Sequence, residues 1–297
     1  MADSEPIVWH NKPELREPVF VAAFRGWNDA GEAATFAATH LARVWDAEKI
    51  ASIDPEDFYD FQAVRPQVQL VDGITRQITW PTNEFWAVRF EDRPHDVLLL
   101  VGTEPNTHWR KFTSSIIEVA RSYKVDLVLT FGALLADVPH SRPVHITGTA
   151  VNQPLIEKLG LQRSRYEGPT GIVGVLHDAF SEAGIDSASL WVAVPHYLAV
   201  TPNPKAALAL VDRAAELIGA KADVEALQRA AEAYEARVSE IIASDEDIQS
   251  YVRMLEERAD EREGEPQIDP TKLPSGEAIA AELEKFLRER TDGDDRQ

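Results

Sequence analysis

The sequence predicts an α/β fold in which a mixed, mostly parallel sheet is flanked by helices and followed by an α-helical C-terminal extension. Short apolar runs alternate along the chain with segments whose apolar residues recur at helical spacing. This alternation is typical of a parallel sheet covered on both faces. Beyond about residue 220 the composition shifts to Ala, Glu, Arg and Gln, which indicates the helical extension.

The elements follow in order. Buried or partly buried strands are expected at residues 19–24, 49–53, 84–90, 96–101, 126–131, 144–150 and 190–194. Helices are expected after residue 31, where Ala33, Ala37, Leu41 and Val44 share one face, and at 107–123, 171–183 and 204–218. Asp72-Gly73 lies between two alternating segments in residues 68–80, which predicts a β-hairpin that adds an antiparallel element to the sheet.

We expect an α/β core at residues 1–219, a helical hairpin at 220–260, and a linker, an amphipathic helix (275–290) and a disordered tail at 261–297. The hairpin has an apolar stripe that is interrupted at Asp245, and Ser244 with Asp247 indicates a new helix cap. We expect it to lie outside the core and contribute to association; packing on the core is the alternative. Its buried side would comprise Leu227, Tyr234, Ile241, Ile248 and Leu255.

Composition excludes several classes of function. Hydrophobic residues make up 44%, enough for a sizeable core, and the net charge of −20 argues against binding to nucleic acid or to an anionic membrane. The chain has no cysteine, which excludes disulfides, thiolate catalysis and cysteine zinc sites. With neither a signal peptide nor an apolar run of membrane-spanning length, we expect a cytoplasmic protein.

The candidate site lies where four predicted strands end, because carboxyl ends of parallel strands meet at one edge of a sheet. The loops are residues 26–31, 102–106, 132–137 and 195–197, and the glycine-rich stretch 168–174 enters a helix. Residues 26–31 could cradle an anion or only form a capped, tight turn, and residues 168–174 could form a phosphate nest or only let the helix pack close to the sheet. No metal-binding or nucleophile motif is present, and we expect no cofactor. The candidate residues are Gly26, Trp27, Asn28, Asp29, Gly31, Gly102, Glu104, Asn106, Gly168, Thr170, Gly171, His196 and Tyr197.

Five motifs, GWNDAG, GTEPNTHW, FGALLADVPHSRP, YEGPTGIVG and VPHYLAVTPNP, occur in that order. Together they resemble the proteasome assembly chaperone 2 family over residues 19–219, and the acidic, cysteine-free chain with its helical extension resembles the actinobacterial branch. The resemblance implies a phosphorylase/hydrolase-like fold, homo-oligomerisation and proteasome subunits as partners. Chaperone relatives dock through a C-terminal hydrophobic-Tyr-X tail, whereas this chain ends Asp295-Arg296-Gln297. We therefore do not expect this chain to dock on the proteasome through such a tail.

Two hypotheses about function result. The first is a non-catalytic, self-associating binding protein that resembles the proteasome assembly chaperones. The second is an enzyme acting on a nucleoside or another small polar metabolite at the strand carboxyl ends. In the second, Asp29, Glu104 and His196 would serve as acid, base or hydroxyl binder, since carboxylates and imidazole can be tuned to near neutrality.

Overall fold

The computed structural model describes residues 6–164, 166–197 and 200–264. The chain divides into two compact units, residues 1–256 and 257–297. The described part of the second unit is the end of one helix, at 257–264. The amphipathic helix and tail predicted beyond residue 264 lie outside the described residues, and the predicted domain division at residues 219 and 260 stays a prediction.

A mixed sheet forms the centre of the first unit. Within the described residues it has nine strands, in the order β1-β3-β6-β7-β2-β8-β11-β9-β10. The four central strands are parallel: β7 (Val97–Thr103), β2 (Val19–Arg25), β8 (Leu127–Ala136) and β11 (Asp186–Pro195). The flanking strands are β1 (Ile7–Trp9), β3 (Glu48–Ile53), β6 (Asn83–Val88), β9 (Ile146–Ala150) and β10 (Gln162–Arg163). The predicted fold class is thus confirmed.

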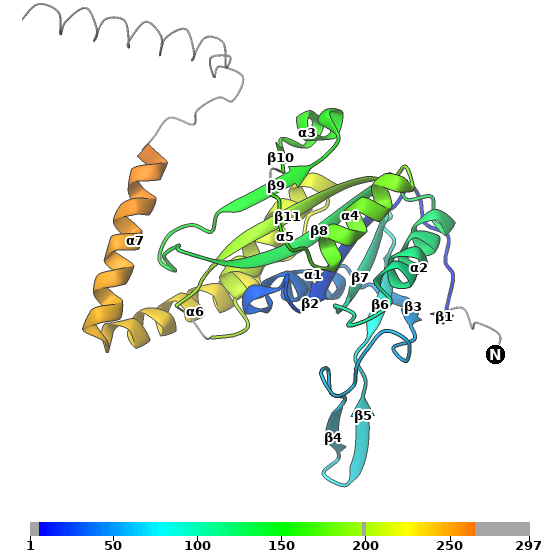
Figure 1. Ribbon diagram of the computed structural model, residues 1–297, viewed down its shortest axis with the longest axis horizontal. Helices are drawn as coiled ribbons and strands as arrows, with labels where there is room; N and C mark the ends of the chain where they lie inside the picture. Colours follow the sequence, from blue (N-terminus) through cyan, green and yellow to red (C-terminus); the bar gives the residue numbers. More distant parts are fainter. Residues whose placement is uncertain (1–5, 165, 198–199, 265–297) are drawn as a thin grey trace, which may run out of the picture. The chain divides into compact units, whose positions relative to one another are not determined.

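Helices cover both faces of this sheet (Figure 1). α1 (Ala33–Val44) and α5 (Pro204–Ile218) pack in one apolar cluster, and α2 (Trp109–Ser122) and α4 (Ile172–Glu182) pack in the other. The strands supply the two clusters by alternation: Val21 faces the first, whereas Phe20 and Ala22 face the second. A short helical turn, η1 (Ala30–Glu32), leads into α1, and α3 (Gln153–Leu159) lies between β9 and β10.

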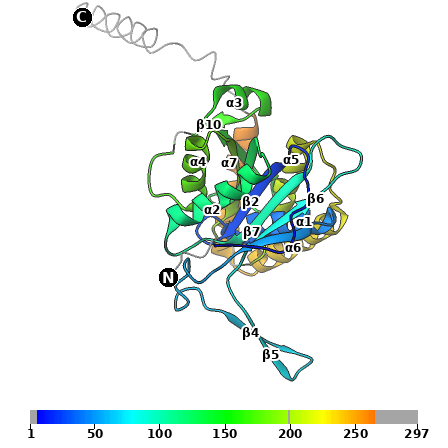
Figure 2. The same cartoon turned by 90° about the vertical axis from the view of Figure 1, so that its right-hand side faces the viewer.

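The β-hairpin predicted in residues 68–80 is present, but the prediction that it joins the main sheet is wrong. β4 (Gln67–Val71) and β5 (Thr75–Thr79) pair only with each other and project from the sheet (Figures 1 and 2). Asp72 and Gly73 at its tip both have positive φ (53° and 71°), as a tight hairpin turn requires. The mixed character of the main sheet comes instead from β1, β3, β6 and β9, each of which runs antiparallel to a neighbour.

The C-terminal extension forms two helices, α6 (Glu225–Ala243) and α7 (Glu246–Gly264). The cap between them is Asp245 rather than Ser244, because the Asp245 carboxylate accepts the backbone N–H groups of residues 247 and 248 at 3.0 and 3.1 Å. α6 packs against α5, and Leu227 joins the core cluster of the sheet. Of the five residues predicted for the buried side, Leu227, Tyr234 and Leu255 are buried within the chain, whereas Ile241 and Ile248 are 48% and 37% exposed. The chain itself therefore covers much of the stripe, and a role of these helices in association stays a prediction.

Candidate functional site

The four central strands bring their carboxyl ends to one edge of the sheet, as the sequence predicts. The edge differs from the prediction in one respect. Residues 132–136 belong to the loop predicted at 132–137, but they continue β8 and pair with residues 191–195 of β11. The edge has two parts. The first part consists of the loops that follow β2 and β7 and the loop that precedes α4.

These three loops converge on the carboxylate of Glu104. Its Oε1 accepts the backbone N–H of Ile172 at 2.7 Å and the side-chain amide of Asn28 at 3.3 Å. Its Oε2 accepts the backbone N–H of Trp27 at 3.2 Å. Ile172 is the first residue of α4, so a carboxylate of the protein itself satisfies an N–H group at a helix N-terminus, where a bound anion would otherwise be favoured.

Glycines allow this close approach. A Cβ atom on Gly171 would lie 2.3 Å from Asn28 Nδ2 and 2.8 Å from Glu104 Oε1, so a side chain at this position would push the loops apart. Gly26 has a φ of 134°, a conformation that L-residues rarely adopt. The Glu104 carboxylate therefore occupies the place where an anion could be cradled, and it holds two loops and a helix together; we call this arrangement the Glu104 lock.

Asp29 caps a helix. The side chain is 7% exposed, and its Oδ1 accepts the backbone N–H groups of Ala34 and Thr35 at 2.7 and 3.3 Å. Its Oδ2 accepts the Thr35 hydroxyl at 2.5 Å. Burial raises the pKa of the Asp29 carboxyl, and the hydrogen bonds to the carboxylate oppose that shift. Next to it, the carbonyl of Gly31 accepts the backbone N–H of Asn203 at 2.8 Å, which ties the corner to the start of α5.

The remaining glycine-loop candidates also have local partners. The Asn106 side-chain oxygen accepts the backbone N–H of residue 60 at 3.0 Å, and the Thr170 hydroxyl donates to the Gly171 carbonyl at 3.4 Å. Gly102 faces the Asn83 side chain, and Gly168 has a φ of 155° beside residue 166. Trp27 differs from these, since its side chain is 64% exposed. It is the member of this group with a large apolar surface available to a partner.

His196 and Tyr197 belong to a second group, at the ends of β8 and β11. His196 Nδ1 lies 3.1 Å from Asp137 Oδ1, and its ring packs edge-on against Tyr197 and Tyr251 at centroid distances of 5.8 and 5.6 Å. The Tyr197 hydroxyl accepts the backbone N–H of His140 at 2.8 Å and lies 3.0 Å from its Nδ1. Burial raises the pKa of Tyr197 to about 12, so this hydroxyl remains protonated at neutral pH.

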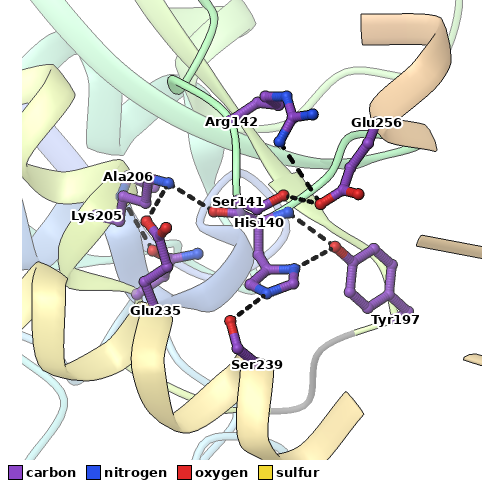
Figure 3. A network of polar contacts seen from close by, with 10 residues as sticks. His140, Ser141, Arg142, Tyr197, Lys205, Ala206, Glu235, Ser239 and Glu256 are labelled. Atoms are coloured by element: carbon purple, nitrogen blue, oxygen red, sulfur yellow. Dashed lines mark hydrogen bonds and ion pairs between the residues drawn. The ribbon is translucent and has the colours of Figure 1, made fainter. Parts of the chain in front are cut away.

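The contacts of His140 extend this group to the C-terminal helices (Figure 3). Its Nε2 lies 3.0 Å from Ser239 Oγ on α6, and its carbonyl accepts Lys205 Nζ from α5 at 2.6 Å. Lys205 also pairs with Glu235 of α6 at 2.5 Å. Desolvation lowers the pKa of His140, which favours the neutral ring.

The next residues in the loop reach α7. The Ser141 hydroxyl donates to Glu256, and Arg142 pairs with the same carboxylate at 3.7 Å (Figure 3). Sequence reasoning missed this polar network because His140 stands alone among loop residues and its partners lie far along the chain. The network joins the loop after β8 to three helices, and its contacts are those of a structural clamp.

In the part of the chain that the structure describes, no group of three or more His, Asp or Glu residues could hold a metal ion. Among the described helices, none is long and apolar enough to cross a membrane.

Comparisons with known proteins identify one family and several similar solved structures. The model of the PAC2 family matches residues 23–242. A PAC2 family protein from Streptomyces avermitilis is 45% identical with a TM-score of 0.74, and the Mycobacterium tuberculosis proteasome-assembly chaperone homologue Rv2125 is 45% identical with a TM-score of 0.72. Each alignment covers 79% of this chain and 99% of the other.

A more distant likeness concerns the fold alone. Pyrococcus furiosus PbaB, an archaeal proteasome activator, has a TM-score of 0.66 at 20% identity, over 79% of this chain and 97% of that one. No curated protein matches the chain in sequence. Since the family model spans most of the chain and includes the Glu104 lock and the His140 loop, the chain belongs to the PAC2 family.

Proposed function

We propose that this protein is a non-catalytic, self-associating binding protein that takes part in proteasome assembly. The relative from Mycobacterium tuberculosis is described as a proteasome-assembly chaperone homologue, which supports proteasome subunits as partners. The binding hypothesis is favoured over the enzymatic one by the site itself. The carboxylates of Asp29 and Glu104, which the enzymatic hypothesis needs, each accept three hydrogen bonds from the surrounding loops and helices.

The β4–β5 hairpin is the observation that carries self-association. All ten residues of its two strands are exposed. Side chains alternate across a hairpin, so one face carries an apolar set while the other is mainly polar. The apolar set on the strands is Val68, Leu70 and Ile78, which are 62%, 62% and 57% exposed, with Arg76 opposite Leu70; Ile74 in the turn is 85% exposed. The other face carries Gln67, Gln69, Val71, Thr75, Gln77 and Thr79.

A second copy of the chain is the partner that fits this face. An isolated two-stranded hairpin is marginally stable in water, and its unpaired edges and apolar side chains are stabilised when another chain covers them. In a two-fold arrangement the same face meets itself, so one apolar surface supplies both halves of the interface. Covering the four apolar side chains would contribute on the order of 5 kcal/mol before the entropy cost of association.

The test compares two pairs of directly opposed hairpin residues. Val68 lies opposite Ile78 on the apolar face, and Gln69 lies opposite Gln77 on the polar face. In light scattering after size exclusion, wild type and the Q69S/Q77S control should form an oligomer, whereas V68S/I78S should run as a monomer with an unchanged far-UV circular dichroism spectrum. A monomeric wild type at tens of micromolar, or an unchanged V68S/I78S oligomer, would refute the association.

The proteasome role needs a separate measurement. Purified α- and β-ring subunits are mixed with and without this protein, and ring assembly is followed by native electrophoresis. Faster assembly or a trapped intermediate that contains this protein is expected. Identical time courses with no complex would exclude the proteasome as partner while leaving self-association intact.

A further inference from the structure

We propose that a cavity beside α1 binds a small planar anion, that is, a flat ring that carries a negatively charged group. The cavity has a volume of about 690 Å³, within the range of small-molecule sites. Its walls come from α1, the base of the β4–β5 hairpin, β6 and the carboxyl ends of β2 and β7. The residues used below are Arg25, Arg43, Arg65, Asp46, Trp80 and Trp86.

Positive charge gathers in this cavity although the chain as a whole is strongly acidic. Arg25, Arg43 and Arg65 line it, whereas the net charge of the chain is −20. Two carboxylates also line it, but Glu84 is neutralised by Lys49 at 2.5 Å. Three guanidinium groups against the remaining carboxylate, Asp46, leave two positive charges. A local excess of arginine favours an anionic ligand.

One of these arginines is positioned by a buried partner. Arg43 donates from Nη2 to His40 Nδ1 at 3.1 Å, while His40 Nε2 donates to the carbonyl of Asp223 at 2.8 Å. His40 is 3% exposed, so this chain of hydrogen bonds fixes both the tautomer of the ring and the place of the guanidinium. Arg25 and Arg65 have no hydrogen bond or ion pair from their side chains within the described residues and can turn toward a ligand.

The cavity walls also contain two indole rings. Trp86 packs partly buried against the core, and Trp80 is held edge-on by Phe61 at a centroid distance of 4.8 Å. Trp80 remains 45% exposed, which leaves indole surface for a ligand ring. Flat rings pack well on indole, and arginine forks bind carboxylate and phosphate oxygens in a bidentate manner. Together these groups select a ring with an anionic substituent, as in a nucleoside monophosphate or an aromatic carboxylate.

Isothermal titration calorimetry of the full chain tests the proposal with four probes. AMP and 1-naphthoate each combine a ring with a negative charge, inorganic phosphate has charge alone, and adenosine has a ring alone. We expect AMP, 1-naphthoate or both to bind, at least tenfold more tightly than phosphate and adenosine, and more weakly as salt increases. Binding of AMP alone would identify a nucleotide as the source of the anion, and binding of naphthoate alone would identify an aromatic acid.

Variants then locate the binding to the cavity. R25A and R43A should each weaken it by about tenfold or more, whereas R110A, which removes an exposed arginine of α2, should leave it unchanged. Arg25 and Arg43 are exposed, so both variants should keep the wild-type circular dichroism spectrum. The proposal fails if neither AMP nor naphthoate binds, if phosphate or adenosine binds as tightly, or if R25A and R43A bind like R110A. Because oligomeric mass is measured independently, this failure is distinguishable from that of self-association.

Discussion

The partly buried imidazole of His177 predicts that the protein loses stability in mildly acidic solution. The ring lies on α4 and bridges two strands: Nε2 is 2.8 Å from the Thr130 hydroxyl on β8, and Nδ1 is 2.7 Å from the Ser187 hydroxyl on β11. Desolvation lowers the pKa of His177 from 6.5 to about 4. The folded protein therefore resists protonation at a pH where the unfolded chain accepts it.

The direction of the effect follows from this difference. Above about pH 6.5 the ring is neutral in both states and the full stability is present; as the pH falls from 6.5 toward 4, protonation favours the unfolded chain. A difference of 2.5 pKa units at about 1.36 kcal/mol each gives at most about 3 kcal/mol over the whole window. Part of the ring is accessible to solvent, which reduces the effect. Between pH 7.5 and 5.5 we therefore expect the titration of His177 to lower the free energy of unfolding by about 1 kcal/mol.

Urea unfolding of wild type and H177Q at pH 7.5 and 5.5 measures this contribution. Both values of pH lie above the sequence pI of about 4.8, which keeps the protein away from its least soluble range. We expect H177Q to be less stable at pH 7.5, because the ring's two hydrogen bonds are altered. It lacks the titrating group, so its free energy of unfolding should fall by about 1 kcal/mol less than that of wild type between the two conditions. The other seven histidines contribute equally to both proteins. Equal losses in the two proteins, or a His177 pKa above 6 by NMR, would refute the reasoning.

Three substitutions test the other structural assignments, each by chemical denaturation. E104A should lower the free energy of unfolding by about 2–3 kcal/mol, because three donors lose their acceptor. E118A, on the exposed face of α2, should lower it by less than about 0.5 kcal/mol. Equal effects of the two substitutions would contradict the Glu104 lock. G171A should cost about 1–3 kcal/mol through overpacking, and a neutral result would show that the loops have room to part. Y197F should cost about 1 kcal/mol and Y166F close to nothing, since the first hydroxyl is held in the polar network and the second is on an exposed loop; similar values would mean that the network adds no stability.

Local patterns account for what the sequence predicted of the fold. The central strands and the helices that cover them have strong periodicities, so their type and approximate position follow from nearby residues. The hairpin shows the limit of this reasoning. Asp72 and Gly73 identify its turn, but nothing near them says whether the strands join the larger sheet, because strand pairing is decided by distant residues. The short elements β1, α3 and β10 were not predicted, since two to seven residues hold too little pattern.

The candidate edge was predictable as a place but not in its contacts. Parallel strands bring the GWNDAG loop, Glu104 and the start of α4 to one edge, and that much follows from topology. That Glu104 fills the helix N-terminus depends on a contact between residues 68 positions apart. Likewise, the sequence singled out Tyr197 but gave no sign that His140 joins it to Ser239, 99 positions further along than His140. Contacts of this range are properties of the folded chain.

The two proposals meet at the base of the β4–β5 hairpin. The apolar face that would cover a second copy lies at residues 68–78, and Arg65, Gln67, Thr79 and Trp80 at the base of the same hairpin line the cavity. A planar anion bound there would contact both the base of the hairpin and the sheet. It would therefore restrict the orientation of the hairpin relative to the sheet. If ligand and second copy favour the same hairpin position, each must strengthen the binding of the other by the same factor, because coupling between binding sites is reciprocal. The distinct residue sets allow either interaction to be removed alone, so the coupling can be measured in the same protein that shows both.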